Sequence, residues 1–94
     1  MILVREVFIA KPGMASKLAT LMRRAMPSYP AKIRIMTDLT GVFNKVVMET
    51  EMDNLAEFDK RMEEYRKDTM MREKMAGYTE MYKSGKREIY QVHE

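Results

Sequence analysis

The sequence predicts an α+β protein in which helices cover one face of a four-stranded antiparallel sheet. Apolar residues alternate with polar ones in several stretches, as in half-buried strands, and recur at helical spacing in others. These stretches follow the order β-α-β-β-α-β. Only a short bend at residues 39–41 separates the two middle strands, which requires an antiparallel hairpin. The chain has 94 residues, enough for one domain over 1–94 with a modest core.

The first strand is expected over Ile2–Ala10, a stretch rich in β-branched and aromatic residues. A Lys-Pro-Gly segment ends it. Apolar side chains at helical spacing then predict a helix over residues 13–26. Pro27 and Pro30 end this helix, because proline cannot continue a helix and restrains the residue before it.

The central hairpin is predicted from strands at residues 31–38 and 42–52. In the second of these strands, a period of two gives one largely apolar face. That face holds Val42, Asn44, Val46, Met48, Thr50 and Met52, and the opposite face holds Phe43, Lys45, Val47, Glu49 and Glu51. Asn44 interrupts the apolar face, and a buried amide needs a hydrogen-bond partner. That partner is either the protein or a ligand, and the sequence leaves both open.

The second helix begins at a capping box, with Asn54 at the N-cap and Glu57 three residues later. The helical phase changes around Thr69, which predicts a break at residues 68–70.

Beyond the break, a further helical segment is expected over residues 70–83, with Gly85 as its left-handed C-cap. The last strand is predicted over residues 86–93. Right-handed crossovers around the central hairpin then give the ferredoxin-like sheet, with the strands in spatial order 4-1-3-2.

The sheet face away from the helices predicts a homodimer. Helices can cover only one face of such a sheet. The other face carries Phe43 and Val47 beside Lys45, Glu49 and Glu51. It is too apolar to lie wholly in water and too polar for the core of a monomer. We therefore expect a second copy of the chain to pack there.

The overall charge argues against a nucleic-acid partner. Charged residues make up 33% of the chain, the net charge is +3, and both signs are interspersed rather than clustered. The third strand also carries a single aromatic residue, Phe43, whereas RNA-binding modules of this topology stack bases on several. The N-terminal apolar run is interrupted at Arg5 and no stretch is long enough to span a bilayer. We expect a soluble cytoplasmic protein with no membrane partner.

Twelve methionines are a marked excess for this length. Methionine is flexible and polarizable, so the excess indicates a soft core, an adaptable apolar pocket or a copper(I) site. A copper site usually includes Cys or His, and here there is no Cys and only one His, His93. The sequence also lacks a Gly-rich phosphate loop, paired-His spacing and a Ser or Cys nucleophile motif. We therefore expect no metal and no cofactor, and the sequence assigns no catalytic residue.

The change of helical phase near Thr69 predicts a place for a cavity. The two helical halves cannot both lie flat on the sheet, so a gap is expected at the elbow between them. The candidate ligand-binding residues around this elbow are Asn44, Met48, Phe58, Met62, Tyr65, Met75 and Tyr78. In the competing interpretation, the methionines fill the elbow and leave a complete core.

Three segments resemble small dimeric α/β-barrel proteins of the NIPSNAP-like and antibiotic-biosynthesis-monooxygenase-like families. They are residues 7–13 (VFIAKPG), 40–49 (TGVFNKVVME) and 55–58 (LAEF). The resemblance implies that the two sheets of a dimer close into a barrel, with a pocket between sheet and helices. Some such proteins oxidise polycyclic aromatic substrates without a metal or flavin, and others degrade haem.

The chain departs from the active members of these families. The haem-degrading relatives use an Asn on the first strand, a Trp and a haem-ligating His on a helix. Here there is no Trp, Arg5 and Glu6 stand where the Asn would be, and no His lies in a predicted helix. The resemblance thus implies a fold and not a reaction. We expect a small homodimeric protein that binds an apolar or aromatic metabolite between sheet and helices; the alternative is a cofactor-independent oxygenase or isomerase.

Overall fold

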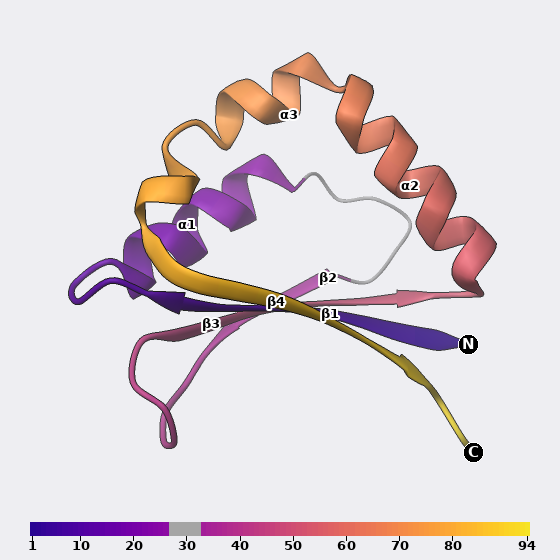
Figure 1. The fold of residues 1–94 in the computed structure, drawn as a ribbon, viewed down its shortest axis with the longest axis horizontal. Helices are drawn as coiled ribbons and strands as arrows, with labels where there is room; N and C mark the ends of the chain where they lie inside the picture. The colour runs from indigo at the N-terminus through magenta and orange to yellow at the C-terminus, as the bar shows by residue number, and fades with distance from the viewer. Residues whose placement is uncertain (27–32) are drawn as a thin grey trace.

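A four-stranded antiparallel sheet forms the base of the molecule, and every helix lies on the same side of it (Figure 1). The computed structural model describes residues 1–26 and 33–94. The strands are β1 (Ile2–Ala10), β2 (Ile33–Thr37), β3 (Lys45–Met52) and β4 (Tyr82–Gln91). Their spatial order is β2-β3-β1-β4, with every neighbouring pair antiparallel. This is the predicted ferredoxin-like α+β fold.

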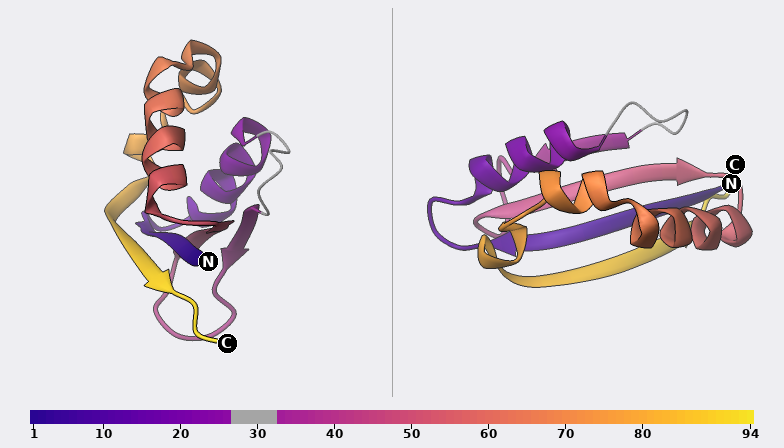
Figure 2. Two further views of the ribbon diagram at one scale, coloured as in Figure 1. Left: turned by 90° about the vertical axis from the view of Figure 1, so that its right-hand side faces the viewer. Right: turned by 90° about the horizontal axis from the view of Figure 1, so that it is seen from above.

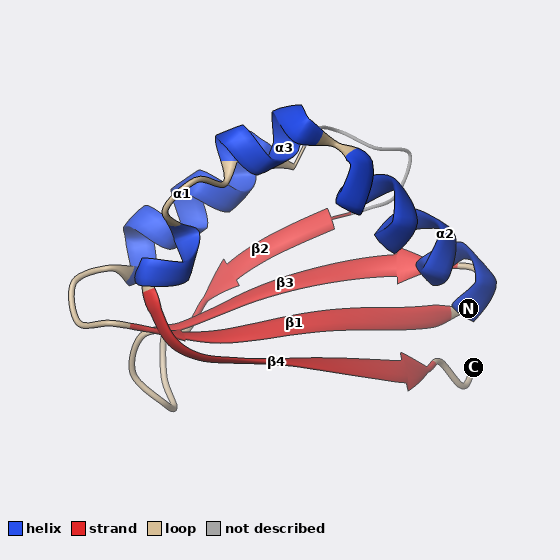
Figure 3. Cartoon of the chain, turned by 45° about the horizontal axis from the view of Figure 1, so that its top comes forward, coloured by secondary structure: helices blue, strands red, loops and turns tan. Residues whose placement is uncertain are grey.

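The helices form a second layer in two separate tracks. They are α1 (Ala15–Ala25), α2 (Leu55–Lys67) and α3 (Thr69–Lys74), followed by a 3₁₀ turn, η1 (Tyr78–Glu80). Figure 2 shows α1 above the half of the sheet that ends in β2, while α2 and α3 follow the other half. Seen obliquely in Figure 3, α2 and α3 form an arch whose bend stands away from the strands.

The core lies on the helix-facing side of the sheet in two clusters. One contains Ile2, Val4, Met52 and Phe58, beneath α2. The other contains Ala10, Leu18, Met22 and Val46, beneath α1. Each fully buried large apolar side chain stabilises the fold by about 1.5–3 kcal/mol relative to exposure.

The predicted alternation along β3 is confirmed where the strand exists. Val46, Thr50 and Met52 are buried toward the helices. Glu49 alternates with these residues along the strand and so lies on the outer face of the sheet. There β1 and β2 each place an arginine directly opposite it.

The start of this strand, however, differs from the prediction. β3 begins at Lys45, and residues 38–44 form a loop in place of a tight bend at 39–41. Asp38 closes the loop: its carboxylate accepts from the Lys45 amide at 2.8 Å, and its own amide donates to the Lys45 carbonyl at 3.2 Å. Asn44 has φ 64°, a left-handed conformation that Asn tolerates better than most residues. Asn44 therefore lies in the loop and not on the apolar face.

The capping of α2 and the break after it are confirmed. The Glu57 amide donates to Asn54 Oδ1 at 2.9 Å, while the Glu57 carboxylate accepts from the Asp53 amide at 2.6 Å, one residue before the N-cap. Helix α2 ends at Lys67 and α3 begins at Thr69. Between them, the Asp68 carboxylate accepts from the Met71 amide at 3.0 Å and caps α3.

The predicted helix over 70–83 is wrong in its second half. Helix α3 ends at Lys74, and Gly77 (φ 86°) reverses the chain into η1. The chain enters β4 at Tyr82, so Gly85 lies within a strand and does not cap a helix. The helical pattern gives no sign of this early end, because residues 82–91 form a strand through pairing with β1, which is distant in the sequence.

The remaining boundaries shift by a few residues. Helix α1 spans Ala15–Ala25 within the expected 13–26, and β2 ends at Thr37, one residue before the expected end at 38. Strand β4 ends at Gln91, and His93 lies exposed beyond it. Pro27, Pro30 and the first two residues of the expected strand at 31–38 lie outside the described residues.

Candidate functional site

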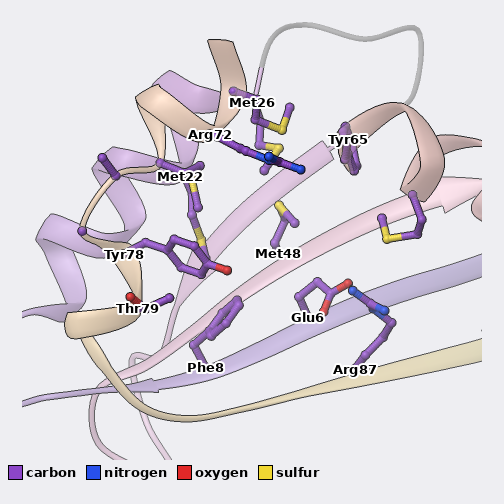
Figure 4. A pocket seen from close by; sticks show the side chains of 15 residues that line it. Glu6, Phe8, Met22, Met26, Met48, Tyr65, Arg72, Tyr78, Thr79 and Arg87 are labelled. Carbon is purple, nitrogen blue, oxygen red and sulfur yellow. The ribbon is translucent and has the colours of Figure 1, made fainter. Parts of the chain in front are cut away.

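A pocket of about 410 Å³ opens between the sheet and the helices, on the concave side of the bend between α2 and α3 (Figure 4). We call it the elbow pocket. Its floor comes from β1, β3 and β4, and its walls come from α1, α2, α3 and the turn that leads to η1. The lining residues are Glu6, Phe8, Met22, Met26, Met48, Met62, Tyr65, Met71, Arg72, Met75, Ala76, Gly77, Tyr78, Thr79 and Arg87.

Methionine dominates the lining. Six of the twelve methionines line the pocket, from α1, β3, α2, α3 and the residue after α3. Since they come from five places in the chain, the fold gathers them from both helical tracks and the sheet. Unbranched thioether side chains can change rotamer at little cost, so the pocket surface can adapt to different apolar shapes.

Aromatic rings close the end of the pocket near η1. Phe8 packs against Tyr82 with ring centroids 4.9 Å apart, and Tyr82 lies 5.9 Å from Tyr78. Phe8 and Tyr78 also line the pocket, so this stack fixes one of its walls. Beneath the Phe8 ring lies Gly85, whose lack of a side chain leaves room for the ring.

One ion pair lies on the pocket floor. Glu6 and Arg87 are directly opposite in the β1–β4 pair, and Arg87 Nε donates to Glu6 Oε1 at 2.5 Å. The Glu6 side chain is 14% exposed and that of Arg87 is 46% exposed. The guanidinium also lies 5.2 Å above the ring of Phe58. Packing on one side and the carboxylate on the other therefore hold Arg87 in place.

A second arginine crosses the pocket from α3. Arg72 Nη2 donates to the backbone carbonyl of Arg66, in the last turn of α2. In Figure 4 its side chain extends between Met26 and Met48 toward Tyr65. Arg72 thus links the two arms of the elbow while its guanidinium faces the pocket.

Five of the seven predicted site residues line the pocket: Met48, Met62, Tyr65, Met75 and Tyr78. Two do not. Phe58 is buried in the neighbouring cluster with Ile2, Val4 and Met52. Asn44 lies in the loop before β3, where its backbone carbonyl accepts from the backbone amide of Ala10 at 2.7 Å.

Sequence reasoning missed the charged residues of the pocket. Glu6 shares a face of β1 with Val4 and Phe8, and its alternation with Arg5 could have placed it toward the helices. Arg87 could not have been found in this way, because its place depends on the register of β4 against β1. Arg72 depends on where α3 lies after the break.

The described residues contain no group of three or more His, Cys, Asp or Glu side chains placed to hold a metal ion. Among the same residues, no helix is long and apolar enough to cross a membrane.

The outer face of the sheet carries a separate charged network. Glu49 is 7% exposed and accepts from Arg5 Nη2 at 3.0 Å and from Arg34 Nη2 at 2.7 Å. The Arg5 guanidinium lies 5.3 Å above the Tyr90 ring. The Tyr90 hydroxyl donates to Glu88, and this hydrogen bond lowers the pKa of Glu88 and raises that of Tyr90.

Comparison with known proteins adds information on the fold. No protein-family model matches the chain, and no curated protein matches it in sequence. Among solved structures, an uncharacterized NIPSNAP domain protein from Burkholderia xenovorans is 12% identical with a TM-score of 0.86, over 99% of this chain and 95% of that one. A NIPSNAP family protein from Agrobacterium tumefaciens is 11% identical with a TM-score of 0.85, over 98% and 85%.

The second predicted resemblance is found as well. A putative antibiotic biosynthesis monooxygenase from Deinococcus radiodurans is 13% identical with a TM-score of 0.70, over 100% of this chain and 94% of that one. At such identities the likeness shows the fold alone. The chain therefore has the fold of the NIPSNAP domain proteins and antibiotic biosynthesis monooxygenases that three of its segments resemble.

Proposed function

We propose that the protein is a homodimeric binding protein that holds an apolar or aromatic small molecule in the elbow pocket. The observation that carries this proposal is an open space of about 410 Å³ lined by six methionines and three aromatic residues. Small-molecule sites are typically apolar clefts of about 300–1,000 Å³ with a few polar groups. The elbow pocket has this size and this composition.

Apolar burial alone gives such a ligand modest affinity. A two-ring aromatic of Trp size buries on the order of 200 Å², worth about 5 kcal/mol at about 25 cal/mol per Å². Lost translational and rotational freedom offsets most of this gain. A polar anchor in the pocket would add affinity and orientation.

Methionine-methyl NMR tests the binding proposal, because the chain contains its own control. With isotope-labelled methionine methyl groups, a ligand such as naphthalene should shift the signals of the six lining residues. They are Met22, Met26, Met48, Met62, Met71 and Met75. The other six, Met1, Met14, Met36, Met52, Met70 and Met81, should change little. Saturable shifts confined to the second group would contradict the proposal.

The outer face of the sheet supports the homodimer part of the proposal. No helix covers this face within the described residues, yet it carries the Arg5–Glu49–Arg34 network beside Val47. The loop at 38–44 extends to the same side of the sheet. Two of its apolar residues are largely in solvent: Leu39 is 98% exposed and Phe43 is 83% exposed. A second copy packed on this face would remove those side chains from water.

The alternative function is a cofactor-independent oxygenase or isomerase. One observation favours it: the largely buried Glu6 carboxylate faces the apolar pocket, where it could accept a proton from a bound substrate. Oxygen uptake tests the oxygenase and product analysis tests the isomerase, each with a panel of hydroxylated polycyclic aromatics and with Glu6→Gln as the control. Absence of both activities, or an activity that Glu6→Gln leaves unchanged, would argue against a catalytic role of Glu6.

A further inference from the structure

The charges that line the elbow pocket do not balance. Three ionised side chains line it: Glu6, Arg72 and Arg87. Glu6 and Arg87 compensate each other through their 2.5 Å contact. Among the described residues, Arg72 forms no ion pair with a carboxylate, and its hydrogen bond goes to the neutral carbonyl of Arg66. The pocket therefore presents one positive charge without a counter-charge.

Arg72 is also placed to contact a ligand. Its bond to the Arg66 carbonyl uses one of the five N–H donors of the guanidinium. Arg72 lines the pocket together with Met26, Met48 and Tyr65, and Figure 4 draws its guanidinium extending among their labels. The residue is exposed, so this side of the pocket is where apolar lining meets solvent.

We propose that the ligand is an apolar acid, whose carboxylate pairs with Arg72 while its apolar body occupies the methionine-lined space. This inference rests on the proposed function of the pocket. A guanidinium matches a carboxylate with two parallel hydrogen bonds, stronger than neutral ones. A neutral ligand can accept only the weaker, neutral kind of hydrogen bond from Arg72, and an amine is repelled by it.

The ion pair on the floor sets the orientation of this acid. The Glu6 carboxylate repels a second carboxylate, and Arg87 is already engaged by Glu6 and by the ring of Phe58. The acid group therefore lies at Arg72 and the apolar end lies toward Phe8 and Tyr78.

Three probes of equal shape separate this inference from the proposed function. Naphthoate, naphthamide and the naphthylmethylammonium ion share one apolar body and differ in charge. Each is titrated into the protein with isotope-labelled methionine methyl groups, at low and at high salt. We expect naphthoate to bind most tightly, roughly tenfold above naphthamide, and to lose this advantage at high salt.

Two variants assign the effect to Arg72. Arg72→Gln should weaken naphthoate binding about tenfold and change naphthamide binding much less. Arg72→Lys, which keeps the charge without the planar fork, should bind naphthoate more tightly than Arg72→Gln does. Arg24→Gln is the matched control, because it removes the same charge from an exposed position of α1 outside the pocket.

The outcomes are distinct. Equal affinity for naphthoate and naphthamide, or equal effects of Arg72→Gln and Arg24→Gln, overturns the inference while the pocket function stands. If Arg72→Lys binds naphthoate no more tightly than Arg72→Gln does, the positive charge is not what attracts the acid, and the inference is overturned. If none of the three probes shifts the six lining methionines, the proposed function itself fails.

Discussion

Gly85 and Phe8 lie directly opposite each other in the β1–β4 pair, and a Cβ at position 85 would lie 3.0 Å from the Cδ1 atom of the ring. That distance is tighter than an ordinary Cβ contact, so a side chain there requires the ring to shift by a few tenths of an ångström. Because Phe8 lines the elbow pocket, the moved ring changes the shape of the pocket. Glycine is therefore needed at position 85 to leave room for the Phe8 ring beneath the pocket, and not to form a turn.

Gly85→Val should therefore destabilise the protein by about 1–3 kcal/mol, as overpacking typically does. Naphthoate binding should weaken in the same variant. Urea unfolding and the methionine-methyl titration measure the two effects. Ser84→Val, the preceding residue on the opposite face of the strand, is the control and should stay near the wild-type value. Equal free energies of unfolding for the two variants would show that the Phe8 ring can move aside without destabilising the protein.

The second prediction concerns the cap at the elbow. Asp68→Ala removes the acceptor for the Met71 amide and should cost about 0.5–2 kcal/mol. Because Met71 and Arg72 line the pocket, this variant should also weaken ligand binding. Asn54→Ala removes an equivalent cap from the far end of α2 and should cost similar stability without affecting binding. A loss of affinity common to both variants would mean that stability alone controls binding.

A third prediction concerns pH. The Tyr90 hydroxyl lowers the pKa of Glu88, so their hydrogen bond stabilises the fold above the ordinary pKa of 4.5 and is lost as the pH falls through the lowered value. For Tyr90 the pKa is raised, so the same bond is present below pH 10.0 and is lost as the pH rises through the raised value.

Phenolate absorbance measures the Tyr90 titration directly, as the difference between the wild-type protein and Tyr90→Phe. Glu88→Gln should bring the Tyr90 pKa back toward its ordinary value, since the hydrogen bond to the carboxylate is the largest cause of the shift. Lys86→Gln changes a neighbouring charge and should have the smaller effect. An identical Tyr90 titration in wild type and Glu88→Gln would refute the assignment.

The fourth prediction is the dimer. Sedimentation at tens of micromolar should give the mass of a dimer. We expect its two copies to be related by a two-fold axis and to bury more than roughly 1,000 Å² in total. Val47→Lys places a charge at the centre of the outer face and should yield a folded monomer. Thr20→Lys, an equal charge on the exposed side of α1, should leave the dimer intact. A monomeric wild-type protein at this concentration would rule the dimer out.

The sequence by itself determined the features that depend on neighbours along the chain. The bounds of β1, the capping of α2 by Asn54 and the break before Thr69 all follow from residues a few positions apart. Five of the seven predicted pocket residues were found in this way, because methionines and tyrosines at helical spacing mark the inner side of the elbow. Alternation along β3 likewise placed Met48 toward the helices and Glu49 away from them.

Only the tertiary structure decided the features that join distant segments. Glu6 meets Arg87 from 81 residues away, and that contact depends on the register of β4. Asn44 carries the alternating pattern of β3, but its left-handed backbone (φ 64°) turns the chain out of the strand at that point. Residues 82 and 83 continue a helical pattern, yet pairing with β1 provides the backbone hydrogen bonds that an isolated last turn would lack. The pattern of neighbouring residues does not predict these features, because the interactions that stabilise them come from a strand distant in the sequence.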